Sequence, residues 1–121
     1  MKKYVMLALS ILGVCMISSS VALAAPAMPE IATKAACITC HAIDRKVIGP
    51  AWNWVAYKYK DDKATGKKEI MDQIANGGKG RWTKYTGGIV MPPMKAQTTE
   101  AQREELADFI LNLDPVAPPD M

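Results

Sequence analysis

The chain has 121 residues, of which 50% are hydrophobic, and its 15 Lys and Arg residues outnumber 12 Asp and Glu residues for a formal net charge of +3. This length predicts a single small domain, and a charge so close to balance argues against a nucleic-acid-binding protein. Lys2 and Lys3 supply two of the basic residues, so the remainder of the chain is nearly neutral.

Residues 1–24 have the layout of a secretory signal peptide. A basic MKK start precedes an apolar run, and an A-x-A cleavage site ends at Ala24. A retained membrane anchor is the alternative, although the strongly apolar part is shorter than the ~20 residues that a span needs. A lipoprotein signal around Cys15 fits less well, because Val14 is a poor residue before a lipidated cysteine. We therefore predict export to the periplasm and a mature chain without membrane attachment.

Two helices are predicted in the first half of the mature chain. Residues 29–40 begin with Pro29 and Glu30, which favour a first helical turn. Residues 51–60 follow an Ile-Gly-Pro break, and their apolar side chains recur at i, i+3, i+4 and i+7, on one helix face. These side chains are Trp52, Val55, Ala56 and Tyr59.

A further helix and a long loop are predicted next. Residues 66–78 place Ile70 and Ile74 on one face and stop at Asn76-Gly77, a common C-cap signal. The apolar residues of segment 79–97 recur with no regular period, and the segment contains adjacent prolines flanked by two methionines. We therefore predict a loop. Loops of this length inside a small domain are usually either functional or disordered.

The last predicted helix starts at a capping box formed by Thr99 and Gln102. Its apolar stripe consists of Leu106, Phe109, Ile110 and Leu113. Residues 114–121 form a Pro-rich tail that we expect to be mobile. No segment alternates convincingly with period two, so the predicted fold class is all-α, with the domain over residues 25–113.

Cys37, Cys40 and His41 form a C-x-x-C-H motif, and His41 is the only histidine in the chain. A structural zinc site needs four ligands, and the mature chain has no other Cys or His to complete one. A thioredoxin-like pair expects a βαβ setting, which the pattern lacks. A disulfide across two residues closes too small a loop to stabilise a fold. The motif instead favours covalent attachment of a c-type haem, with His41 as an iron ligand.

The segment VMPPM supplies Met91 and Met94 as candidates for the second iron ligand. A thioether is a soft, uncharged ligand that raises the reduction potential of haem iron, and paired prolines stiffen the loop that carries it. Methionine is also a common core filler. Since the chain has eight methionines, core packing is the alternative role for either side chain.

Together these motifs resemble the small bacterial class I cytochromes c of the c551/c552 type, over almost all of residues 29–113. The segments that carry the resemblance are CITCHAIDRKVIGPAW, IANGGKGRW, and MPP followed by a capped helix. The resemblance implies a class I cytochrome c fold, with four to five helices around one covalently attached haem c and its iron.

The resemblance also assigns roles to the site residues. It implies thioether bonds from Cys37 and Cys40, with His41 as the proximal and Met91 as the distal iron ligand. It further implies that the Pro50 carbonyl accepts a hydrogen bond from the His41 imidazole and fixes its tautomer.

Two further residues, Arg81 and Trp82, are implied to hydrogen-bond a haem propionate, with core packing as the alternative role of Trp82. The chain departs from the family pattern at two places. Residues 83–90 lengthen the segment before the ligand methionine. Met94 occupies the position of an amide that often steadies the ligand sulfur, so either the sulfur of Met91 has less support or Met94 competes with it for the iron; the family pattern favours Met91.

An iron with both axial positions filled by protein implies a one-electron carrier rather than an enzyme. The family implies a monomer with redox protein partners: a donor such as a quinol-oxidising complex, and an acceptor such as a nitrite reductase or a terminal oxidase. Five exposed lysines form either a cationic docking ring or an ordinary solvated surface: Lys34, Lys46, Lys79, Lys84 and Lys95. The rival functions are a five-coordinate haem sensor, a small peroxidase, and a haem subunit docked permanently in a larger redox enzyme.

Overall fold

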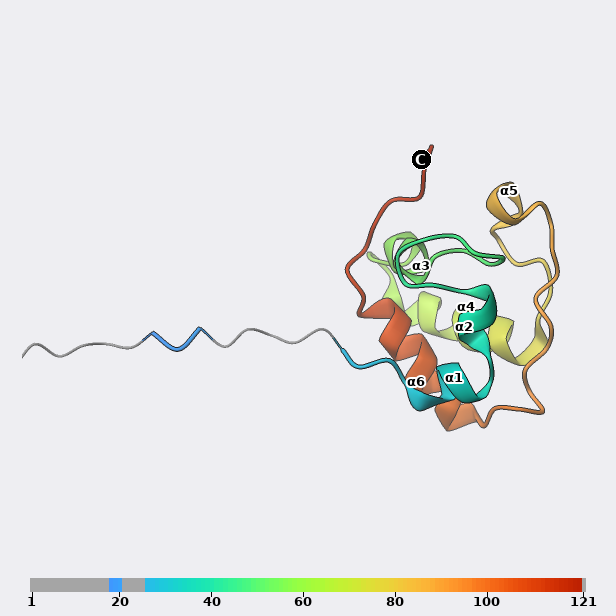
Figure 1. The fold of residues 1–121 in the computed structure, drawn as a ribbon, viewed down its shortest axis with the longest axis horizontal. Helices are drawn as coiled ribbons and strands as arrows, with labels where there is room; N and C mark the ends of the chain where they lie inside the picture. Colours follow the sequence, from blue (N-terminus) through green and yellow to red (C-terminus); the bar gives the residue numbers. More distant parts are fainter. Residues whose placement is uncertain (1–17, 21–25, 121) are drawn as a thin grey trace, which may run out of the picture.

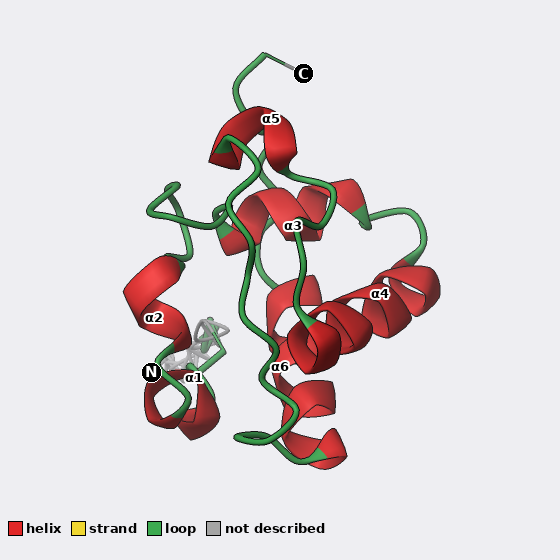
Figure 2. Ribbon diagram, turned by 90° about the vertical axis from the view of Figure 1, so that its right-hand side faces the viewer, coloured by secondary structure: helices red, strands yellow, loops and turns green. Residues whose placement is uncertain are grey.

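The computed structural model of the chain describes residues 18–20 and 26–120, and the predicted signal peptide lies almost entirely outside them. The described residues form six helices and no strand, which confirms the all-α prediction (Figures 1 and 2). The helices are α1 (Glu30–Lys34), α2 (Cys37–Cys40), α3 (Trp52–Lys58), α4 (Lys63–Asn76), α5 (Thr83–Thr86) and α6 (Glu100–Leu111). Within this part of the chain, no helix combines the length and apolarity needed to cross a membrane.

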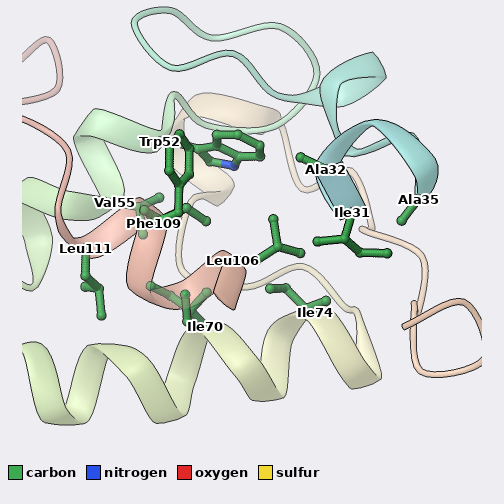
Figure 3. Close-up of a cluster of buried hydrophobic side chains, with 12 residues drawn as sticks. Ile31, Ala32, Ala35, Trp52, Val55, Ile70, Ile74, Leu106, Phe109 and Leu111 are labelled. Atoms are coloured by element: carbon green, nitrogen blue, oxygen red, sulfur yellow. The ribbon is translucent and has the colours of Figure 1, made fainter. Parts of the chain in front are cut away.

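The hydrophobic core is built around α6. This helix packs most extensively on α4, and it also contacts α3 and α1. Leu106 is only 1% exposed, and Figure 3 shows it at the centre of the cluster, above Ile70 and Ile74 of α4. Phe109 and Ile110 are also buried. The predicted apolar faces of α4 and α6 therefore meet each other.

Side-chain caps fix where the two long helices begin. At α6 the predicted capping box is present: the Gln102 N–H donates to Thr99 Oγ1 (3.2 Å), and the Thr99 N–H donates to Gln102 Oε1 (2.9 Å). α4 begins at Lys63, earlier than predicted, because the Asp62 carboxylate accepts a hydrogen bond from the Thr65 N–H (3.1 Å). An N-cap of this kind satisfies a backbone donor that the first helical turn leaves free.

The continuous helix predicted over residues 29–40 is wrong. Ala36 has a left-handed backbone, with φ 55, and separates α1 from α2. The Ala35 N–H still donates to the Ile31 carbonyl (2.8 Å), whereas the Thr39 N–H donates to Ala36 itself (3.1 Å). The chain therefore ends one helix and starts a new turn immediately before the C-x-x-C-H motif.

The loop over residues 79–97 and the C-terminal tail pack against each other. The Tyr85 hydroxyl of α5 donates to the Pro119 carbonyl (2.9 Å), and the Val116 N–H donates to the Asn53 carbonyl of α3 (3.1 Å). Tyr85 also contacts Trp54 of α3, with ring centroids 5.3 Å apart. Figure 2 shows α5 on the side of α3 away from α4, next to the end of the tail.

Candidate functional site

A single cavity contains every site residue that the sequence indicated. It has about 1100 Å³ of atom-free space including its mouth, and its wall is formed by α2, α3, α4, α6 and the loops around His41 and Met91. The seven site residues of the family resemblance are all among the residues that line it: Cys37, Cys40, His41, Pro50, Arg81, Trp82 and Met91. Most of the remaining wall is apolar and belongs to the core cluster, including Trp52, Val55, Ile70, Ile74 and Leu106.

The single turn α2 carries both thiols of the motif. Cys37 and Cys40 are three residues apart on this turn, and no disulfide joins them. Burial raises the pKa of the Cys37 thiol. The Cys40 carbonyl accepts hydrogen bonds from the Gly49 N–H (2.7 Å) and the Ile48 N–H (3.2 Å). These two bonds bring the loop that follows His41 back against α2.

The loop fixes the orientation and the protonation of His41. Its Nδ1 lies 3.0 Å from the Pro50 carbonyl oxygen, so the hydrogen bond implied by the resemblance is present. A carbonyl can only accept, so Nδ1 carries the proton and Nε2 keeps a free lone pair. Burial lowers the pKa of His41, which favours the neutral form that binds metals. A Cβ on Gly49 would lie 2.3 Å from His41 Cε1, so only glycine lets the loop approach the ring.

The end of α4 holds the backbone of Met91. The Met91 N–H donates to the Gly78 carbonyl and the Gly78 N–H donates to the Met91 carbonyl, both at 2.9 Å. A Cβ on Gly77 would lie 2.4 Å from the Met91 carbonyl oxygen. Met94 lies elsewhere: its side chain packs against the core cluster, and its N–H donates to Ile74 (2.9 Å).

Arg81 has a partner that sequence reasoning did not identify. Its Nη2 donates to Glu69 Oε1 at 2.5 Å, and the Tyr59 hydroxyl donates to the other oxygen of Glu69. Both Tyr59 and Glu69 line the cavity. Glu69 stands between exposed Lys68 and buried Ile70, and no local sequence pattern marks it for this role. Trp82 is half-buried beside Tyr85, with ring centroids 6.0 Å apart.

Residues 29–114 match the family model of cytochrome c. The chain belongs to the cytochrome c family. It is 41% identical to cytochrome c-552 of Nitrosomonas europaea over 91 residues, which cover 74% of this chain and 81% of that protein. It is 40% identical to cytochrome c-551 of Pseudomonas denitrificans over 78 residues, or 64% of this chain and 87% of the relative.

The fold agrees with this assignment. The crystal structure of Nitrosomonas europaea cytochrome c552 is similar with a TM-score of 0.60 and 37% sequence identity, covering 69% of this chain and 95% of that one. The protein is thus a class I cytochrome c of the c551/c552 type with one covalently attached haem c and its iron. The cavity suits this group, because its wall is largely apolar and presents two thiols and a neutral imidazole nitrogen.

Proposed function

We propose that this cytochrome carries single electrons between redox proteins in the periplasm and performs no catalysis of its own. In this proposal Cys37 and Cys40 form the thioether bonds, and His41 and Met91 are the axial ligands of the iron. The bound haem supplies a one-electron couple at its iron. The residues of the chain hold the ligands in place, exclude water and offer a surface to the partner.

One observation carries the proposed ligation: backbone contacts hold His41 and Met91 on the wall of the same cavity. Pro50 fixes the His41 tautomer, and Gly78 holds Met91 through two hydrogen bonds. Ligands held in this way need little rearrangement when the charge of the iron changes, which suits electron transfer. Met94 is a poorer candidate, because it does not line this cavity.

The propionate contacts of the resemblance remain part of the proposal. Trp82 offers an indole N–H, which can only donate, and it lines the cavity next to Arg81. Arg81 already pairs with Glu69 through Nη2. A guanidinium has five N–H donors, so the remaining ones are available to a haem propionate.

The mouth of the cavity is the proposed docking surface. Three of its lining residues are strongly exposed for apolar side chains: Ile48 (43%), Ile89 (56%) and Val90 (57%). Of the five lysines of the predicted docking ring, only Lys79 lines the cavity, and Lys34 is paired with Glu30 (2.9 Å). We infer that the redox partner presents a mainly apolar face, with a quinol-oxidising complex as a possible donor and a nitrite reductase or terminal oxidase as a possible acceptor.

The signal-peptide layout of residues 1–24 supports the proposed location. Cleavage after Ala24 would release a mature chain whose domain begins before α1, with thiols that receive the haem outside the cytoplasm. We propose that this mature chain is a periplasmic monomer.

The optical spectra of the purified protein in both redox states test this function, with Met91→Ala and Met94→Ala as matched variants. We expect a far-red sulfur-to-iron band in the ferric protein, lost in Met91→Ala and kept in Met94→Ala. Loss of the band only in Met94→Ala would assign the ligand to Met94. A high-spin native protein that readily binds cyanide or carbon monoxide would contradict the carrier function and favour a sensor or a peroxidase.

A further inference from the structure

Three polar side chains from different elements meet on the cavity wall. Tyr59 follows the last residue of α3, Glu69 lies in the middle of α4, and Arg81 lies in the loop before α5. The Tyr59 hydroxyl and the Arg81 guanidinium each donate to a different oxygen of the Glu69 carboxylate. All three residues line the cavity, and we name them the Glu69 network.

Glu69 is the less exposed of the two charged residues in this network. Its side chain is 29% exposed, compared with 61% for Arg81. Burial and then the hydrogen bond with Glu69 raise the pKa of Tyr59, so its hydroxyl remains protonated at neutral pH and continues to donate. The other charged groups that face the network are all solvent-exposed: Lys58, Lys68, Asp72 and Lys79.

We propose that Glu69 lowers the reduction potential of the haem iron from the cavity wall, and that Tyr59 and Arg81 are positioning residues that hold its carboxylate there. The inference rests on the proposed one-electron function. Reduction removes one positive charge from the iron, so a nearby carboxylate favours the oxidised protein. The Arg81 charge acts in the opposite sense, but it is more exposed and solvent and salt screen it more strongly.

Redox titration of the haem-loaded protein tests the proposal through Glu69→Gln, which keeps the side-chain size and an acceptor oxygen. At the solution potential where the native protein is half oxidised, we expect the oxidised-to-reduced ratio to fall about threefold or more in this variant. Arg81→Gln should raise the same ratio, because the carboxylate then lacks its counter-charge.

Glu104→Gln is the matched control. It removes the same charge from an exposed position on α6 that pairs with Lys67 (2.7 Å) and lies outside the cavity lining. At the same solution potential, we expect the oxidised-to-reduced ratio of this variant to equal that of the native protein. An unchanged ratio in Glu69→Gln, or an equal shift in Glu104→Gln, would overturn the proposal.

A second readout is independent of electron transfer. NMR of an isotope-labelled tyrosine ring measures the pKa of Tyr59, which we expect to fall in Glu69→Gln and to stay unchanged in Glu104→Gln. If the pKa of Tyr59 does not respond, the network does not form and the proposal fails.

The ferric spectrum, recorded in the same titration, separates this inference from the proposed function. A native protein without the sulfur-to-iron band would refute the His/Met carrier. An intact band together with an unshifted ratio would refute only the role of Glu69.

Discussion

Ala36 adopts a left-handed backbone, with φ 55, although it carries a Cβ. This conformation costs an L-residue about 1–2 kcal/mol. The reversal ends α1 and lets the Ala36 carbonyl accept from the Thr39 N–H, which starts the turn that carries Cys37 and Cys40. The backbone conformation of Ala36 therefore sets the orientation of α2, and with it of the two thiols, relative to α1.

We predict that Ala36→Gly raises the free energy of unfolding by about 1 kcal/mol, because glycine adopts positive φ without steric cost. The side chain is exposed, so the substitution removes no core contact. Denaturant unfolding of the haem-loaded protein measures the change.

Ala64→Gly is the control, since Ala64 is also exposed but lies within α4. There the same substitution should lower stability by up to about 1 kcal/mol. If both variants lose stability, relief of backbone strain at Ala36 is excluded.

At the residue scale, some contacts could be predicted and others could not. The His41 to Pro50 hydrogen bond followed from a motif in which the two residues are close in sequence, and it is present. The Arg81 to Glu69 pair joins a loop to a helix. No local pattern specifies such a pair, because it depends on how α4 is rotated toward the cavity.

At the scale of elements, the end of α4 and the Met91 loop form one unit. Gly77 ends the helix with φ +66, and the backbone of Met91 and the prolines after it lies against the Gly77 Cα. Gly78 then exchanges two hydrogen bonds with Met91. A change at the helix end should therefore reach the proposed iron ligand.

Gly77→Ala and Gly87→Ala form a matched pair that tests this coupling. Both glycines have positive φ, +66 and +67, but Gly77 has ψ −157, a region restricted almost to glycine, so its substitution also carries more backbone strain than that of Gly87, which has ψ 17. A Cβ on Gly87 would meet nothing within 4 Å. We expect Gly87→Ala to cost about 1–2 kcal/mol through backbone strain alone. Gly77→Ala should cost a further 1–3 kcal/mol or so from overpacking.

Only Gly77→Ala should weaken the ferric sulfur-to-iron band. Denaturant unfolding and the optical spectrum of both variants provide the measurement. Equal costs and unchanged spectra would show that α4 does not position Met91.

The boundaries of elements were predicted less well than their existence. The predicted helix began at Gly66, yet Gly66 lies inside α4, where a Cβ would meet Tyr59 Cβ at 2.6 Å and Leu111 Cδ2 at 3.0 Å. Glycine is needed there for close packing between helices, which a sequence pattern does not display.

At the scale of the whole molecule, the tail and α5 cover the outer side of α3. Trp54, on α3, is 9% exposed and contacts Tyr85 of α5. The tail adds the hydrogen bonds of Val116 and Pro119, and Pro118 is buried. α5, which lies in the segment predicted to be lengthened, thus packs against the tail.

We predict that truncation after Asp114 lowers the free energy of unfolding by about 1–3 kcal/mol, because it removes three hydrogen bonds, two of them to α5. Hydrogen exchange should accelerate in α5, while the ferric spectrum stays unchanged. Val116→Ala is the control: the side chain is 46% exposed and the backbone bond to Asn53 remains. Unaltered exchange in α5 after truncation would show that the tail does not hold it.

The sequence by itself determined the family, the all-α class, the cofactor and the apolar faces of α4 and α6. These features depend on residues that are close in sequence: a C-x-x-C-H motif, helix caps and the helical periodicity of apolar side chains. Only the tertiary structure decided that Met91 and not Met94 lines the cavity, that Glu69 holds Arg81, and that the tail lies against α5. Each of these depends on segments distant in sequence, whose relative placement follows from how the whole core packs.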